Sequence, residues 1–194
     1  MFDDKQFVQD SLRTESQVDS IVVDPQLLAG ATFAFTSAGE ILDQIKKNAF
    51  YGKPYSQVEL AAEFATIIEA LDMMKESIQL IEDESRKETL AVNPRMFHSI
   101  IGIATEASEL VEALELSGGE MDYTNVSEEM GDIGWYQAIA FDEMDTTLEN
   151  SYTAVVEKLK ARYSDKFTSD EAINRDVKEE RVVLEQEQEI NDGC

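Results

Sequence analysis

Apolar residues recur every three or four positions over several long stretches of this chain. The clearest stretch, AEFATIIEALDMMKESIQLIEDESRKETLA, begins at residue 62, and its apolar positions are Phe64, Ile67, Ile68, Leu71, Met74, Ile78 and Ile81. This spacing is typical of an amphipathic helix, which we expect from about Glu63 to Glu88. The stretches SIIGIATEASELVEALEL, NVSEEMGDIGWYQAIAFDEM and LENSYTAVVEKLKARY have the same period. Because no convincing run alternates as a strand does, the pattern predicts an all-α fold, a helical bundle.

The chain also contains an internal repeat. Residues 24–43 align without gaps on 93–112, and after a connection three residues shorter in the second copy, 58–71 align on 124–137. Self-similarity of this kind indicates a duplicated structural unit, here two related helical hairpins. The sequence therefore divides into a polar N-terminal arm (1–22), a degenerate first repeat (23–90), a second repeat (91–176) and a charged C-terminal tail (177–194).

The second copy carries two pairs of acidic residues at helical spacing. Glu106 and Glu109 lie in ATEASELVE, and Glu129 and Asp132 lie in SEEMGD. Residues three apart share a helix face, so two such helices packed antiparallel would bring four carboxylates together. The spacing alone is common in so acidic a chain, but these acids are embedded among apolar residues, where an unpaired carboxylate is costly. A hard divalent cation such as Mg²⁺, which prefers oxygen ligands, would resolve the repulsion.

The first copy lacks half of this acidic set. Ser37 stands where the second copy has Glu106, and Thr66 stands where it has Asp132. We therefore expect the first copy to be unable to hold the metal ion.

The first copy instead has a basic connection between its helices. The segment QIKKNAFYGKPYSQ contains Lys46, Lys47 and Lys53, whereas the matching connection of the second copy, ALELSGGEMDYT, contains no base. Two interpretations stay open. The lysines serve the acids of the second copy, or they are solvated residues of an ordinary connection.

Three further side chains are candidates for contact with a substrate. Trp135 and Tyr136 lie one turn beyond Asp132, where they would stack on a nucleobase or belong to the bundle core, and the core is favoured for Trp135. His98 is the single histidine and lies beside an apolar stretch. One histidine cannot build a zinc site without cysteines, so a core or capping place is favoured over a ligand.

Composition excludes several classes of function. The chain has 41 acidic against 16 basic residues, a formal net charge of -25, which repels nucleic acid and anionic membrane surfaces. Its single cysteine, Cys194, rules out a disulfide framework. The first residues, MFDDKQFVQD, do not resemble a signal peptide, and no stretch reaches the roughly 20 apolar residues of a membrane span. We expect a soluble cytoplasmic protein without nucleic-acid or membrane partners.

Residues 93–176 resemble the MazG-like, all-α nucleoside triphosphate pyrophosphatase superfamily, particularly its phage-type members. The matching pieces are FHSIIGIATEASELVEAL, NVSEEMGDIGWYQAIA, EKLKARYSDKFTSDEAINRD and EERVVLE, and the first copy is similar too, including its KKxxFYGKP element. The resemblance implies a helical bundle of that family's type and hydrolysis of a nucleoside triphosphate to a monophosphate and pyrophosphate. It also implies dimeric or tetrameric assembly, here a homodimer, in the cytoplasm of a phage-infected bacterium.

The resemblance also implies roles for single residues. It assigns Mg²⁺, with Mn²⁺ as a substitute, to Glu106, Glu109, Glu129 and Asp132, which would be the catalytic residues. It suggests Lys158 and Arg162 of KLKARY as phosphate-facing bases, and it places His98 near the substrate. Two departures stand out. Val155 replaces an asparagine that is common in relatives, and LELSGGEM replaces their basic connection.

Two other functions are compatible with these residues. A degenerate member of the same fold could bind a nucleotide without turning it over, as the incomplete first copy and Val155 suggest. The charge of -25 could instead make the chain a DNA mimic that occupies a nucleic-acid-binding protein. The complete acidic set in the second copy favours the enzyme.

Overall fold

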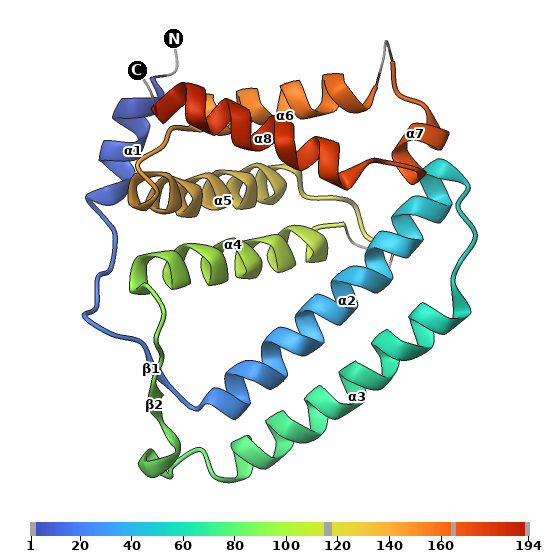
Figure 1. The fold of residues 1–194 in the computed structure, drawn as a ribbon. Helices are drawn as coiled ribbons and strands as arrows, with labels where there is room; N and C mark the ends of the chain where they lie inside the picture. The colour runs from blue at the N-terminus through green and yellow to red at the C-terminus, as the bar shows by residue number, and fades with distance from the viewer. Residues whose placement is uncertain (1–2, 115–117, 164–165, 193–194) are drawn as a thin grey trace. The chain divides into compact units, whose positions relative to one another are not determined.

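The computed structural model describes residues 3–114, 118–163 and 166–192, and it confirms the predicted all-α class (Figure 1). The helices in these ranges are α1 (Asp4–Leu12), α2 (Pro25–Tyr51), α3 (Gln57–Gln79), α4 (Pro94–Glu112), α5 (Tyr123–Glu143), α6 (Leu148–Arg162), α7 (Ser169–Ile173) and α8 (Val177–Asp192). Two short strands, β1 (Val22–Val23) and β2 (Glu88–Thr89), pair antiparallel. Cys194 and part of the predicted connection LELSGGEM lie outside the described residues. None of the described helices is long and apolar enough to cross a membrane.

The helix expected between Glu63 and Glu88 is shorter at its C-terminal end than its apolar pattern suggests. α3 ends at Gln79, and a single 3₁₀ turn follows from Glu84 to Arg86. The Asp83 carboxylate caps this turn, because it accepts hydrogen bonds from the backbone N–H and the hydroxyl of Ser85. Short polar side chains that bond their own backbone in this way compete with the helix.

The chain forms two compact units. The α4–α5 unit comprises residues 1–20, 91–158 and 181–194, and the α2–α3 unit comprises residues 21–90 and 159–180. The repeat boundaries were drawn from the similarity between two stretches of the sequence, whereas these units are defined by which residues pack together. Residues 159–176 therefore group with the first hairpin, although they resemble the end of the second repeat.

Both units contain a hairpin whose helices begin in the same way. Asp24 caps α2 and Asn93 caps α4, and each accepts hydrogen bonds from the next backbone N–H groups beyond a proline at the first helical position. Ser56 caps α3 and Asp122 caps α5. Side-chain oxygens satisfy the free N–H groups at a helix start, and proline has no such group to satisfy. These four residues fix where the four helices of the two hairpins begin.

The two hairpins also pack through small residues at matching positions. In the α2–α3 unit, a methyl group on Gly30 would lie 2.9 Å from the carbonyl oxygen of Ala70. In the α4–α5 unit, Ser99, which aligns with Gly30, donates its hydroxyl to the carbonyl oxygen of Tyr136 at 2.8 Å, and Tyr136 aligns with Ala70. The first helix of each hairpin therefore approaches the second helix closely at the same place.

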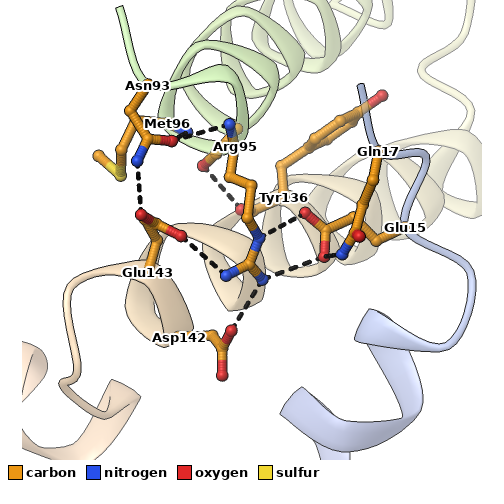
Figure 2. A network of polar contacts seen from close by, with 9 residues as sticks. Glu15, Gln17, Asn93, Arg95, Met96, Tyr136, Asp142 and Glu143 are labelled. Atoms are coloured by element: carbon orange, nitrogen blue, oxygen red, sulfur yellow. Dashed lines mark hydrogen bonds and ion pairs between the residues drawn. The ribbon is translucent and has the colours of Figure 1, made fainter. Parts of the chain in front are cut away.

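The N-terminal arm belongs to the α4–α5 unit. The ring of Phe7 on α1 lies beside Gly134, and the indole N–H of Trp135 donates to the hydroxyl of Thr14 at 3.0 Å. Glu15 then joins a network centred on Arg95 (Figure 2). The guanidinium of Arg95 lies 2.8 Å from the carboxylate of Glu15. It also lies 2.7 Å from the carboxylate of Asp142 and 2.9 Å from that of Glu143, both at the end of α5. One arginine thus ties the arm and the start of α4 to the end of α5.

The C-terminal part of the α2–α3 unit is held by aromatic and ionic contacts. The Phe167 ring lies 5.3 Å from the Tyr51 ring at the end of α2 and 5.5 Å from the Tyr163 ring. The Arg162 guanidinium donates to both carboxylate oxygens of Glu180, at 2.7 and 2.6 Å. The start of α8 is therefore an ordered part of this unit.

Candidate metal and nucleotide site

The structure brings three of the four predicted acidic ligands close together. Glu106 lies on α4, and Glu129 and Asp132 lie one turn apart on α5, which packs along α4 (Figure 1). Carboxylate oxygens of these three residues all lie within 4.8 Å of one another. The helical spacing that suggested the cluster therefore does place these carboxylates on the facing sides of two packed helices.

Glu129 is the buried member of the acidic cluster, with 5% of its surface exposed. Burial raises the pKa of its carboxyl, and a hydrogen bond with Glu106 and the negative charges of Glu109 and Asp132 raise it further. Nearby like charges and burial both disfavour the ionised form. No described lysine or arginine forms an ion pair with Glu129, so no paired base among the described residues offsets the negative charge of its ionised form.

Glu109 lies on the open side of this cluster and borders a polar pocket. The pocket has a volume of about 360 Å³ and is shared with Glu129. Its other walls are residues that the sequence interpretation did not select: Glu112, Ala113, Asp122 and Asn125. Asn125 lies one turn before Glu129 and Glu112 one turn after Glu109, so helical spacing alone could have identified both. Asp122 already accepts hydrogen bonds as the cap of α5.

The aromatic candidates lie together beside the cluster. The Tyr136 ring contacts the Trp135 and His98 rings edge-on, with centroids 4.8 and 5.4 Å apart. Nδ1 of His98 is buried and has no hydrogen-bond partner among the described residues. Burial and the charges of Glu106 and the other nearby acids raise the pKa of the Tyr136 phenol. The histidine is therefore a packed neighbour of both aromatic rings, as its apolar flank suggested.

The predicted bases divide between the two units. Lys158 belongs to the same unit as the acids and forms no ion pair with a described residue. Arg162 is paired with Glu180 in the α2–α3 unit, where only 13% of its side chain is exposed. The carboxylate of Glu180 therefore already occupies two of the guanidinium nitrogens that the prediction assigned to phosphate.

The three lysines that the sequence suggested as substrate contacts differ in their surroundings. Lys46 and Lys47 both bind Asp43, which lies about one turn earlier on the same helix. Gly52, with a positive φ of 69°, is the residue at which α2 ends. Lys53 follows it, and the carbonyl oxygen of Lys53 accepts a hydrogen bond from the side chain of Asn48 at 2.9 Å. The KKNAFYGKP element therefore builds the C-terminal cap of α2. Contact between these lysines and the acidic cluster stays a prediction.

The first hairpin differs from the second at the acidic positions. Ser37, which aligns with Glu106, is buried, and the hydroxyl of Thr66, which aligns with Asp132, bonds the carbonyl oxygen of Ala62 on its own helix. Neither position offers a carboxylate.

Compared with protein-family models, curated proteins and solved structures, the chain gave no match.

Proposed function

We propose that this chain is a Mg²⁺-dependent nucleoside triphosphate pyrophosphohydrolase, which converts a (d)NTP and water into a (d)NMP and pyrophosphate. The observation that carries the proposal is the burial of Glu129 against Glu106 and Asp132 with no described base beside it. A divalent cation would compensate this charge, and a donor set made only of carboxylate oxygens suits Mg²⁺, or Mn²⁺ in its place. The resemblance to the MazG-like superfamily supplies the reaction.

Each group then has a chemical task. Bound Mg²⁺ would neutralise phosphate charge and favour attack by water. A carboxylate of the cluster that does not bind the ion accepts the proton of the attacking water, while the α–β anhydride bond breaks and pyrophosphate leaves. Lys158 contacts the outer phosphate oxygens as a point charge. Arg162 stays a predicted phosphate contact, and two of its nitrogens already donate to Glu180.

The experiment is an assay of a panel of ribo- and deoxyribonucleoside triphosphates with Mg²⁺, in which monophosphate and pyrophosphate are resolved by anion exchange. We expect turnover that EDTA abolishes. Glu109→Gln should remove it, whereas Glu40→Gln, the matched change in the first hairpin, should leave most of it. Absence of turnover with every triphosphate, or equal losses in the two folded variants, would contradict the proposal.

A second function is favoured by the Arg162–Glu180 pair. If this pair stays closed, the guanidinium of Arg162 stays engaged with Glu180, and the chain would bind a nucleotide, or a protein through its acidic surface, without efficient turnover. A DNA-mimic role would instead use the net charge of -25. Calorimetric binding of a Mg²⁺–triphosphate without product formation would select the nucleotide binder, and binding of neither would leave the protein-interaction role.

We also propose that the chain is a homodimer. The exposed apolar side chains of α3 include Phe64, Leu71 and Ile78, which are seven residues apart and therefore share one face. An apolar helix face of this length requires a cover, and a second copy supplies one. Light scattering coupled to size exclusion tests this directly. A mass near 21.8 kDa at micromolar concentration, that of one chain, would refute the dimer.

A further inference from the structure

The Tyr136 ring lies directly against the backbone of α4 at Gly102. A methyl group on Gly102 would overlap the ring atoms Cδ1, Cε1 and Cζ of Tyr136, and Gly102 itself is buried. The backbone fixes the position of a Cβ atom at residue 102, so rotation of a methyl group cannot relieve its overlap with the ring. Any side chain at position 102 would therefore displace the tyrosine from its place.

The contacts of Tyr136 show which way its hydroxyl points along the two helices. Its carbonyl oxygen is level with Ser99, and its ring is level with Gly102, one turn further along α4. The next turn of α4 carries Glu106. Long helical side chains lean towards the N-terminus of their own helix, which for Tyr136 is the turn of Asp132. Figure 2 shows the hydroxyl end of this ring directed away from the Arg95 network at the other end of the helices.

The ring of Tyr136 is not free to stack on a nucleobase. Gly102 covers part of it, and Trp135 and His98 pack against it with interplanar angles of 86° and 82°. Its polar end, in contrast, lies towards the turns of Glu106 and Asp132, and burial together with the charges of these acids raises the pKa of the phenol. The hydroxyl is therefore the functional group that this side chain offers to the cluster.

The first hairpin has the large and small residues at these two positions exchanged. Phe33 aligns with Gly102, and Ala70 aligns with Tyr136. An aromatic ring is thus available in each hairpin, but in the first it comes from the other helix and has no hydroxyl. At these two aligned positions, a tyrosine hydroxyl occurs only in the hairpin that also has the complete set of acids.

We infer that Tyr136 serves the acidic cluster through its phenolic O–H, as a hydrogen-bond donor to the anionic oxygens held there, and that Gly102 is the position that admits it. The inference rests on the proposed function and deepens it, because it gives Tyr136 a positioning role in place of base stacking. The oxygen that accepts the hydrogen bond belongs either to the carboxylates and their bound water or to a phosphate group of the substrate.

The test compares three variants of the full chain by titration calorimetry with Mg²⁺ alone and with Mg²⁺ plus a non-hydrolysable triphosphate analogue. Tyr136→Phe keeps the ring and removes the hydroxyl. Tyr152→Phe is the matched control, since it removes a phenol that donates to Gln137 at 2.9 Å elsewhere in the same unit. Gly102→Ala keeps the hydroxyl but expels the ring, and circular dichroism confirms that each variant is folded.

We expect Tyr136→Phe to weaken binding about tenfold, the lower end of the effect of groups that orient metal ligands. Gly102→Ala should weaken it at least as much, and Tyr152→Phe should not change it. A loss with Mg²⁺ alone identifies the carboxylates or their water as the acceptor, and a loss only with the analogue identifies phosphate.

Unchanged binding in folded Tyr136→Phe would overturn the inference and leave Tyr136 as a packing residue. Absence of binding by the unaltered protein would overturn both this inference and the proposed function, so the two failures are distinguishable.

Discussion

The guanidinium of Arg162 and the carboxylate of Glu180 form a two-pronged ion pair in which 13% and 9% of the side chains are exposed. The sequence places Arg162 at the end of α6, and the resemblance suggested that it faces phosphate. The structure instead gives it a carboxylate partner at the start of α8. The segment predicted only as a charged C-terminal tail therefore contributes a buried charge to the α2–α3 unit.

Glu180→Gln should destabilise the protein strongly, because it leaves the charge of Arg162 poorly compensated in a mostly buried place. Removing one partner of a buried pair costs about 3–5 kcal/mol. Urea unfolding of the full chain measures the change. Glu185→Gln is the matched control, since its pair with Arg181 on the same helix is 52% and 70% exposed. An exposed pair contributes about 0–1 kcal/mol, so equal losses would refute this assignment.

Arg95 offers a test through pH. Burial alone would raise the pKa of Glu15, but hydrogen bonds from Arg95 and Gln17 outweigh it and lower the pKa below its ordinary value of 4.5. The unfolded chain therefore binds more protons than the folded chain just below pH 4.5, so the contribution of Glu15 is present above that pH and is lost as the pH falls through the lower folded value.

Glu15→Gln should accordingly lower the stability at pH 7 by about 1.5–3 kcal/mol, the range for hydrogen bonds to charged groups, and flatten the loss of stability on acidification. Urea unfolding between pH 3 and 7 measures both the free energy of unfolding at pH 7 and its decrease at lower pH. Asp10→Asn, which breaks the exposed pair with Arg13, is the control. An acid limb that is unchanged in Glu15→Gln would show that the Arg95 network does not hold the arm.

The sequence predicted the parts of the fold that depend on short-range periodicity. Apolar spacing identified the main helices, and acids three residues apart identified Glu106, Glu129 and Asp132. Arg95 was missed because its partner Glu15 lies 80 positions away in the chain and no local pattern relates them. Glu180 was missed for the same reason, since Lys178, Glu179 and Arg181 beside it are charged as well and only packing selects Glu180.

Glycines show where a local signal exists but is easily overlooked. Gly102 and Gly30 interrupt apolar helical stretches, where glycine is unfavourable by about 1 kcal/mol relative to alanine. Each lies where the partner helix comes too close for a side chain. The sequence shows that these positions tolerate glycine, but the ring or carbonyl group that requires it is supplied by the fold.

Gly30→Ala and Gly39→Ala should therefore have opposite effects, although both residues lie in α2. A methyl group at Gly30 would be 2.7 Å from the Met74 side chain and 2.9 Å from the Ala70 carbonyl oxygen, while no atom of the described residues lies within 4 Å of one at Gly39. Overpacking costs about 1–3 kcal/mol, and alanine in an open helical position stabilises by about 0.4–1 kcal/mol. Thermal unfolding compares them. A stabilised Gly30→Ala would show that the two helices are not in close contact there.

The acidic cluster itself can be tested without a substrate, through the effect of Mg²⁺ on thermal unfolding. A ligand at a hundred times its Kd raises the free energy of unfolding by about 2.7 kcal/mol, which is several degrees in Tm for a chain of this size. We expect such a rise for the unaltered protein, since the ion would bind the folded cluster and the unfolded chain offers no preformed site.

Glu129→Gln should separate the effect of the buried carboxylate on stability without metal from its role as a ligand of Mg²⁺. In EDTA its Tm should equal or exceed that of the unaltered protein, because the neutral amide removes both the cost of burying a charge and the repulsion with neighbouring acids, which together raise the pKa of Glu129. With Mg²⁺ its Tm should not rise, because a ligand has been lost. Glu63→Gln, at the matched position of the first hairpin, should keep the full rise. A Glu129→Gln protein that is less stable in EDTA and still responds to Mg²⁺ would mean that Glu129 is a structural acid and that the ion binds elsewhere.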